Sequence, residues 1–331
     1  MIEAGYKYII PNSATTIRYG QRSLNLFGKV HYAKIVLKAY YDIWTFYRKA
    51  LRDKECYYGP FKGEFGHLLL HTTPFLMHLH KQGVKIHFCG TVIAEPFLID
   101  ESGNSILYEF HKLRDFYGEV LPCNNETVPP KDVQEEIDRF TKKAIESKKA
   151  FLNIADHDMY WFVYRNWQLK GRQHMYHLEK FYQTAKENSC VIFPRFKKNT
   201  EPINNGELWD YMEIARMVAP FFDKVYMTGH PNMSAALQPE GNIEICVSSD
   251  NRKVLETCSN ANLIITQHSG AVHMGSYTNC KVLLIYNGNP PIGGLADTLR
   301  YRANFSDKPI SFAFTMDEIR DFITNYSKKH D

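Results

Sequence analysis

The chain has 331 residues, of which 44% are hydrophobic and 23% are charged, a composition ordinary for a folded globular protein. This length allows two domains with separate cores, because single cores stop growing near ~250–300 residues. There is no apolar run of roughly 18 residues and no visible secretory signal, so we expect neither a membrane-spanning helix nor a secreted protein. The seven cysteines lack metal-binding spacing, which fits the reducing cytoplasm.

Positive charge gathers at the N-terminus. Residues 1–54 hold ten Lys and Arg against three Asp and Glu, a net +7, whereas the whole chain carries +4, so the remainder carries −3. A basic fringe on a slightly acidic body is poor evidence for a nucleic-acid groove and fits better with a basic face that meets a membrane surface, an acidic partner or another subunit. Residues 28–53 combine an aromatic face with a basic flank at helical spacing. That helix either packs its apolar stripe on the next domain or rests on an anionic bilayer as a peripheral membrane contact.

The N-terminal half then alternates short apolar strands with helices. The expected strands are residues 55–58, 84–89, 93–98, 105–110 and 151–154. One helix is expected to begin at Thr73-Pro74 and to end before Gly83, because proline favours the first turn and glycine the position past the end. Further helices are expected over residues 131–149 and about 156–186.

The C-terminal half follows the same pattern. Its expected strands are residues 190–194, 224–227, 242–247, 262–265 and 281–286, and its expected helices are residues 207–218, 251–258, one from about 271 and one from Thr315 with a capping box to Glu318. This alternation predicts an α/β protein with two Rossmann-like, doubly wound domains facing a cleft. We expect an N-terminal extension over residues 1–54 and domains over 55–187 and 188–331.

The turn between the strands at 262–265 and 281–286 is the most informative segment. Ser269, Gly270 and Ala271 place small residues where a strand gives way to a helix. Free backbone N–H groups and the helix dipole at such a terminus favour a phosphate group. The sequence therefore predicts a nucleotide-type ligand at this turn.

A glycine-rich loop, Gly63-Glu64-Phe-Gly66-His67, follows the first strand of the N-terminal half. Open α/β folds bind ligands at the carboxyl ends of their strands, and Gly63 and Gly66 would let the backbone come close to one. Glu64 and His67 can each take up a proton near neutral pH. Alternatively, both are solvated loop side chains.

Two longer motifs, Gly66-His-Leu-Leu-Leu-His-Thr-Thr-Pro74 and His268-Ser-Gly-Ala-Val-His273, resemble those of the heptosyltransferase-like glycosyltransferases. Gly66-His-Leu-Leu-Leu-His-Thr-Thr-Pro74 looks like the Gly-Asp-(apolar)-(apolar)-x-Thr-x-Pro opening of that family. His268-Ser-Gly-Ala-Val-His273, followed by the strand at 281–286, is similar to its Asp-Ser/Thr-Gly-x-x-His motif. The resemblance implies the GT-B fold, with a sugar nucleotide bound mainly by the C-terminal domain, inversion at the sugar, no metal and a ligand role for His273. His67 and His268 stand where the family has aspartates, which leaves the base and the donor open.

Other candidates follow from the chemistry of a departing diphosphate, which needs positive charge or N–H donors. Arg195, Lys197 and Lys198 come after the first C-terminal strand, where they either meet that charge or form a solvated basic loop. Gly229 and His230 end the next strand, and His230 either contacts the donor or caps a turn.

Three further positions are less specific. Ser248 follows the strand at 242–247, where such folds read a nucleobase. Arg114 and Asp115 either bind an acceptor or form a local ion pair. The acidic motif Asp156-His-Asp158 suits a structural or acceptor-site role better than a metal site, so we expect no metal and no cofactor besides the donor substrate.

Together these features predict a glycosyltransferase that moves a sugar from a nucleotide-activated donor to a glycan, a lipid-linked molecule or another hydroxyl acceptor. The acceptor proton would pass to Glu64 or His67. A sugar-nucleotide epimerase and a pyruvyl-type transferase are rivals with the same architecture. A non-catalytic glycan- or nucleotide-binding module is the rival from another class, because fold alone does not settle function.

Overall fold

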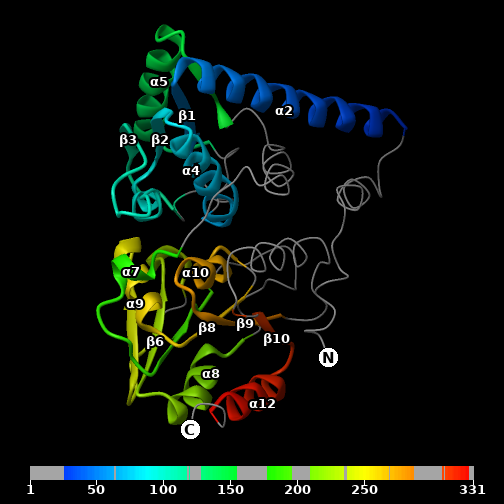
Figure 1. Ribbon diagram of the computed structural model, residues 1–331. Coiled ribbons are helices and arrows are strands. Elements are labelled where there is room, and N and C mark those ends of the chain that lie inside the picture. The colour runs from blue at the N-terminus through cyan, green and yellow to red at the C-terminus, as the bar shows by residue number, and fades with distance from the viewer. Residues whose placement is uncertain are drawn as a thin grey trace. The chain divides into compact units, whose positions relative to one another are not determined.

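A computed structural model describes residues 26–62, 65–117, 119, 128–154, 177–195, 209–234, 237–267, 269–286, 308 and 310–327. The chain forms two compact units that divide between Met175 and Tyr176: the described residues 26–154 belong to the N-terminal unit and the described residues 177–327 to the C-terminal unit. The division falls before Tyr176 rather than after residue 187 as expected. The long helix of the basic N-terminal segment belongs to the N-terminal unit and is not a separate extension (Figure 1).

The N-terminal unit is built on four parallel strands in the order β3-β2-β1-β4. The strands are β1 (Glu55–Phe61), β2 (Lys85–Thr91), β3 (Glu109–Leu113) and β4 (Ala150–Leu152). Cys56 of β1 pairs with Ile86 on one side and with Ala150 on the other. The first strand of the unit therefore lies inside the sheet, and its carboxyl end is flanked by those of β2 and β4.

Two strand predictions for this unit were wrong. Residues 93–98 fall largely in the 3-10 helix η3 (Val92–Phe97), because Pro96 has no N–H to give to a strand ladder. The strand expected at 105–110 starts only at Glu109, where it pairs with His87 of β2.

The helix after β1 starts earlier than predicted. α3 (Phe65–His67), the π-helix η2 (Leu68–Thr72) and α4 (Thr73–Lys81) follow one another without a break. Pro74 therefore lies inside this helix, and the lack of a proline N–H fits the wider π turn that precedes it. The end is as predicted, because Gly83 has a φ of 72° and its N–H donates to the carbonyl of His80 at 2.8 Å.

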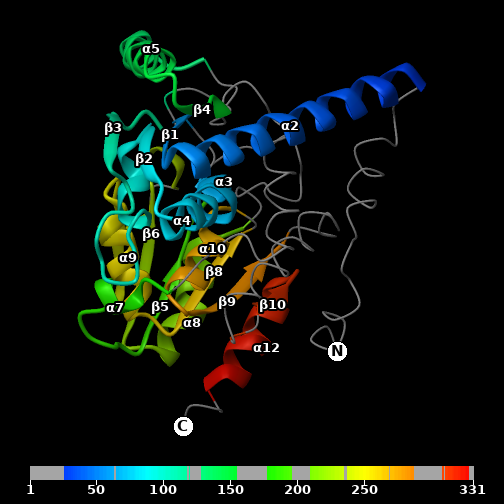
Figure 2. The ribbon, with the colours of Figure 1, turned by 45° about the horizontal axis from the view of Figure 1, so that its top comes forward.

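Helices cover both faces of the four-stranded sheet (Figure 2). On one face lies α5 (Lys131–Glu146), whose Phe140 ring centroid is 5.8 Å from that of Tyr57. On the other face lie α2 (Leu26–Asp53) and α4, whose Phe46 and Phe75 rings are 6.1 Å and 6.0 Å from that of Tyr58. Because successive strand residues point to opposite faces, Tyr57 and Tyr58 serve the two different layers. This confirms the doubly wound prediction for the N-terminal unit.

The C-terminal unit has a sheet of six parallel strands in the order β10-β9-β8-β5-β6-β7. The strands are β5 (Ser189–Ile192), β6 (Lys224–Gly229), β7 (Ile243–Val247), β8 (Leu263–Gln267), β9 (Lys281–Ile285) and β10 (Ile310–Ala313). Counted along the chain from β5 and read from the β7 edge, this is the 3-2-1-4-5-6 order of dinucleotide-binding domains. Five of the strands were predicted, whereas β10 was not.

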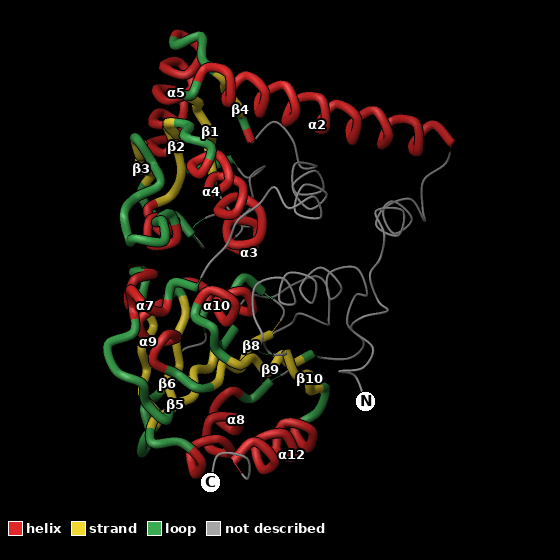
Figure 3. Tube along the Cα trace, in the orientation of Figure 1, coloured by secondary structure: helices red, strands yellow, loops and turns green. Residues whose placement is uncertain are grey.

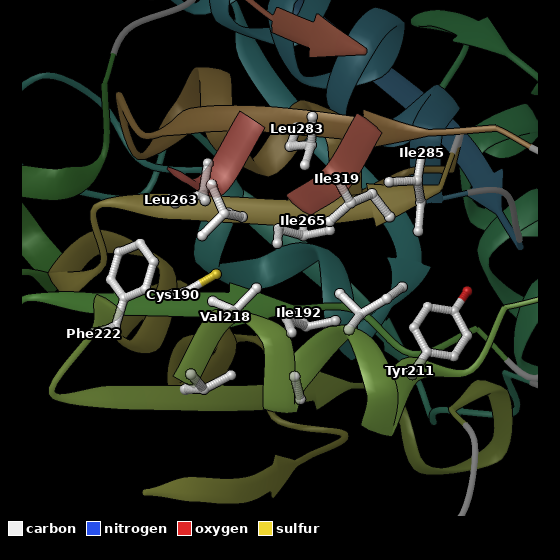
Figure 4. Close-up of a cluster of buried hydrophobic side chains, with 14 of the residues drawn as sticks. Cys190, Ile192, Tyr211, Val218, Phe222, Leu263, Ile265, Leu283, Ile285 and Ile319 are labelled. Atoms are coloured by element: carbon white, nitrogen blue, oxygen red, sulfur yellow. The ribbon is translucent and has the colours of Figure 1, made fainter. Parts of the chain in front are cut away.

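Two helical layers enclose this sheet (Figure 3). The helices of the unit are α7 (Glu179–Tyr182), α8 (Tyr211–Val218), α9 (Asn251–Asn260), α10 (Ala271–Tyr277) and α12 (Met316–Ser327), with the 3-10 turns η7 (Ala219–Phe221) and η8 (Pro231–Met233). One buried cluster joins α8 and α12 to the sheet (Figure 4). It contains Val218 of α8, Ile319 of α12, and strand residues that include Ile192 and Ile265. α9 and α10 pack against β5, β6, β8 and β9.

Side-chain caps set two helix starts in this unit. α8 begins at Tyr211 rather than at residue 207, because the Asp210 side chain accepts the N–H of Glu213 at 2.9 Å. The capping box predicted for the last helix is confirmed. The N–H of Glu318 donates to Thr315 Oγ1 at 3.2 Å, and Glu318 Oε2 accepts the N–H of Phe314 at 2.6 Å.

Candidate functional site

The strand order of the C-terminal unit points to one position for a ligand. In an open parallel sheet, ligands bind outside the carboxyl ends of the strands where the winding direction reverses. Here that reversal lies between the adjacent strands β5 and β8. β5 leads into Arg195, and β8 leads into Ser269 and Gly270. The topology thus brings together two segments that the sequence analysis selected for separate chemical reasons.

A buried hydrogen bond between two side chains links the ends of β5 and β8. Tyr211 begins α8, and its hydroxyl donates to Oε1 of Gln267, the last residue of β8, at 2.9 Å. The Tyr211 oxygen also accepts a hydrogen bond from the backbone of Arg195, while burial dominates and raises the pKa of this phenol above its usual range. Tyr211 therefore remains a neutral phenol and ties the end of β5 to the end of β8. Figure 4 shows its ring at the edge of the buried cluster that also contains Ile192 and Ile285.

Removing this hydroxyl should destabilise the C-terminal unit. We expect Tyr211→Phe to lower the free energy of unfolding by about 1–3 kcal/mol, because the buried Gln267 oxygen loses its donor. Tyr226→Phe is the matched control: its hydroxyl donates to Glu187 Oε2 at 2.7 Å, but that carboxylate is half-buried and can turn to water. Urea denaturation of both variants measures the difference. If both variants lost the same free energy of unfolding, the Tyr211–Gln267 hydrogen bond would stabilise the fold no more than the Tyr226–Glu187 one.

The turn after β8 has the accessibility that a ligand site requires. Ser269 and Gly270 are half-buried, and Ala271 starts α10 with 8% of its surface exposed. The Ala271 N–H donates to Ser269 Oγ at 3.3 Å, so this amide is already used within the turn. His273 is 5% exposed, and its N–H donates to the carbonyl of Gly270 at 3.1 Å. His268 lies outside the described residues.

The next two strands of the sheet carry the remaining described donor candidates. Gly229, the last residue of β6, has a φ of 146°, a conformation that favours glycine. His230 caps a turn, which was one of its two predicted roles, because its Nδ1 accepts the N–H of Asn232 at 3.2 Å. Ser248 follows β7; its N–H donates to the carbonyl of Gly229 at 2.9 Å, and its Oγ accepts the N–H of Asp250 at 3.0 Å. Lys197 and Lys198 lie outside the described residues.

In the N-terminal unit, the winding reverses between β1 and β4. The helix that follows β1 places Gly66 in a buried position and His67 in a half-buried one. The ring of His71, one turn further on, lies 5.5 Å from that of His67. The π-helix η2 begins directly after His67, and π turns occur often at functional sites. Gly63 and Glu64 lie outside the described residues.

Arg114 and Asp115 form local contacts, and the local ion pair was one of the two roles predicted for them. The Arg114 guanidinium donates to Asp132 Oδ2 at 2.5 Å and to Glu119 Oε1 at 2.7 Å, and these hydrogen bonds raise its pKa above the usual range. Asp115 Oδ1 accepts the N–H of Tyr117 at 2.9 Å. Both side chains therefore take part in local contacts of the segment after β3.

Metal ligands do not gather within the described part of the chain. No group of three or more His, Cys, Asp or Glu side chains there could hold an ion. Asp156 and Asp158 lie outside the described residues. His87, which is buried, is flanked by Glu109 at 2.6 Å and Glu55 at 3.0 Å, but it lies toward the amino ends of the strands, away from the edge that carries the site candidates.

Sequence reasoning missed Tyr211 and Gln267. Gln267 was visible as a polar residue closing an apolar strand, directly before the motif that was selected. Tyr211 gave no signal, because its role depends on α8 starting at this residue and on β5 and β8 being neighbours.

No protein-family model and no curated protein matches this chain. Among solved structures, the Escherichia coli heptosyltransferase WaaC with ADP is similar, with a TM-score of 0.50, 9% identity, and coverage of 84% of this chain and 99% of that one. A glycosyl transferase of family 9 from Veillonella parvula has a TM-score of 0.47, 14% identity, and coverage of 83% and 88%. The chain has the GT-B fold. This confirms the fold that the two sequence motifs implied.

Proposed function

We propose that the protein is a glycosyltransferase that moves a sugar from a nucleotide-activated donor to a hydroxyl group of a glycan or a lipid-linked acceptor. This proposal rests chiefly on one observation: β5 and β8, which lead into Arg195 and into Ser269 and Gly270, are adjacent strands at the reversal of a dinucleotide-type sheet. Support comes from the GT-B fold shared with WaaC, whose solved structure holds ADP.

The C-terminal unit would hold the donor. The backbone N–H groups of Ser269 and Gly270, with Arg195 and Lys197 or Lys198, would meet the negative charge of the diphosphate as it leaves. Gly229, His230, Ser248, His268 and His273 would line the remainder of the donor site. Arg195 and the lysines would supply positive charge, and the Ser269 and Gly270 amides would supply N–H donors. We therefore propose a reaction that needs no metal and no cofactor besides the donor.

The N-terminal unit would supply the base. In an inverting transfer, the acceptor oxygen bonds to the anomeric carbon while the bond from that carbon to the phosphate oxygen breaks on the opposite face. The hydroxyl proton passes to His67 or Glu64, and the electron pair of the broken bond leaves with the diphosphate. His67 suits this role because an imidazole nitrogen can accept the hydroxyl proton and because His67 stands directly after the glycine-rich loop.

We place the reaction in the cytoplasm, at a membrane surface. The cysteines in the described residues are unpaired, which fits a reducing compartment. No helix in the described ranges is long and apolar enough to cross a bilayer, so the proposed membrane contact is peripheral. Residues 28–53 would provide it.

A panel of nucleotide sugars tests the function. We expect one of them to raise the melting temperature, because a ligand that binds only the folded state at about 100 times its Kd adds about 2.7 kcal/mol of stability. The free sugar without its nucleotide is the control and should have no effect. Assays with and without acceptor then separate the classes, since an epimerase converts its donor without any acceptor. If every nucleotide sugar leaves the melting temperature unchanged, the proposal fails.

A further inference from the structure

The helix α2 has two apolar faces, and within the described part of the chain only one of them packs against the rest of the fold. Its inner face packs on the four-stranded sheet through small and aromatic side chains. These residues are Val36, Ala39, Ile43, Phe46 and Ala50, none of which is more than 9% exposed. Their spacing of three and four residues is that of a helix stripe facing a core. The inner face therefore anchors α2 to its unit.

The second face carries large apolar side chains that remain in solvent. We call Val30, Leu37, Tyr41 and Trp44 the outer stripe; their exposed fractions are 49%, 67%, 65% and 49%. At 3.6 residues per turn, the outer stripe lies about 150° around the helix from the inner face, and it spans about 21 Å of helix length. Figure 2 shows the N-terminal part of α2 continuing past the strands and α4. Large apolar side chains that are this exposed and clustered on one side of a helix are typical of an interaction surface.

Basic side chains border the outer stripe. Lys34, Lys38, Arg48 and Arg52 are exposed on this side of the helix. The Arg48 guanidinium lies 4.7 Å from the centroid of the Trp44 ring, so charge and aromatic surface are presented together. Only Asp42 and Asp53 oppose them on α2, where they pair with Lys38 and Arg52. The face is both apolar and net positive.

We propose that the outer stripe docks α2 on an anionic lipid bilayer, lying in the plane of the interface. Leu37, Tyr41 and Trp44 would enter the boundary between headgroups and acyl chains, while the lysine and arginine heads reach the lipid phosphates. Tyrosine and tryptophan suit that depth because each has an apolar ring and a polar tip. The bound helix does not span the bilayer.

Charge favours a bilayer over a second copy of the chain. Two outer stripes placed face to face would bring the exposed basic side chains of both copies together, and like charges across an interface oppose association. An anionic surface instead attracts each of these side chains and gains from the apolar stripe at the same time.

This docking deepens the proposed function, because it would hold the transferase where lipid-linked acceptors lie. It rests on α2 alone, however, and vesicle binding can be measured without a donor or an acceptor. Failure of the docking would leave the transferase proposal standing, and failure of the transferase proposal would leave the docking standing.

The experiment is vesicle co-sedimentation of the full chain. Vesicles of phosphatidylcholine and phosphatidylglycerol in equal amounts should bind the protein at least about tenfold more strongly than phosphatidylcholine alone, because each basic side chain near an anionic surface contributes roughly fivefold. Leu37→Glu with Trp44→Glu should abolish binding to both, and Lys34→Glu with Arg48→Glu should remove the preference for anionic vesicles. The melting temperature of each variant should stay within about 2 °C, because the replaced side chains are exposed.

Matched controls come from α5, which also carries exposed apolar and basic residues. Ile145→Glu replaces a side chain that is 64% exposed, and Lys131→Glu with Lys142→Glu reverses two exposed charges. These variants should bind vesicles like the natural protein. Equal loss from the α5 and α2 variants, binding that ignores lipid charge, or a dimer in sedimentation that Leu37→Glu with Trp44→Glu dissolves would each overturn the proposal.

Discussion

Replacing His67 with alanine should lower the turnover of the proposed transfer by about 10²-fold or more, because the acceptor hydroxyl would lose the group that takes its proton. Folding should be unaffected, since the side chain is half-buried in the first turn after β1. Nucleotide binding should also survive, because the proposed donor site is built by the C-terminal unit. Turnover and the thermal shift with donor, measured on the same preparation, check both expectations.

The same substitution at His80 is the matched control. His80 lies at the far end of the same continuous helix, with its Nε2 3.9 Å from Asp100 Oδ2, and it has no part in the proposed chemistry. His80→Ala should keep normal turnover. Glu64→Gln separates the two proposed bases, because at least one of Glu64→Gln and His67→Ala must show the loss. Normal turnover in both would place the base elsewhere.

Replacing Gly59 with alanine should destabilise the N-terminal unit by about 2–6 kcal/mol, which combines backbone strain with overpacking. Gly59 lies in β1 with a φ of 137°, and an added Cβ would come within 2.5 Å of the carbonyl oxygen of Cys89 in β2. A backbone oxygen in the neighbouring strand cannot move aside as a flexible side chain can. Urea denaturation measures the effect, and failure to recover folded protein counts as the same result.

Gly83→Ala separates the backbone strain of a positive φ from the steric clash with the neighbouring strand. Gly83 also has a positive φ, 72°, but an added Cβ would meet nothing within 4 Å. The loss there should be about 1–2 kcal/mol, the cost of the left-handed conformation alone. If the two variants lose the same free energy of unfolding, the close approach of β1 to β2 at Gly59 is not as the structure has it.

Much of the fold could be predicted because its elements carry local signals. Apolar runs between turn residues gave β5, β6, β7, β8 and β9, and the Thr315–Glu318 box marked the start of α12. Where a local signal had two meanings, prediction failed. Thr73-Pro74 looked like a helix start, yet the helix already runs from Phe65, and the apolar residues before Pro96 form a 3-10 turn.

The candidate site was predictable only in pieces. Ser269 and Gly270 were found from the strand–turn–helix pattern, and Arg195 from the charge that a diphosphate needs. Neither signal says that β5 and β8 are neighbours, because strand order is a property of the whole sheet. The Tyr211–Gln267 hydrogen bond depends on that order, so it could not be read from spacing along the chain.

The central claim is that the reversal between β5 and β8 binds the diphosphate of a nucleotide donor. A crystal structure of the full chain soaked with ADP, UDP or GDP tests it most directly. We predict the two phosphates within hydrogen-bond distance of the Ser269 and Gly270 amides and of the Arg195 guanidinium. A diphosphate bound at another edge of the sheet, with no contact to Ser269 or Gly270, would contradict it.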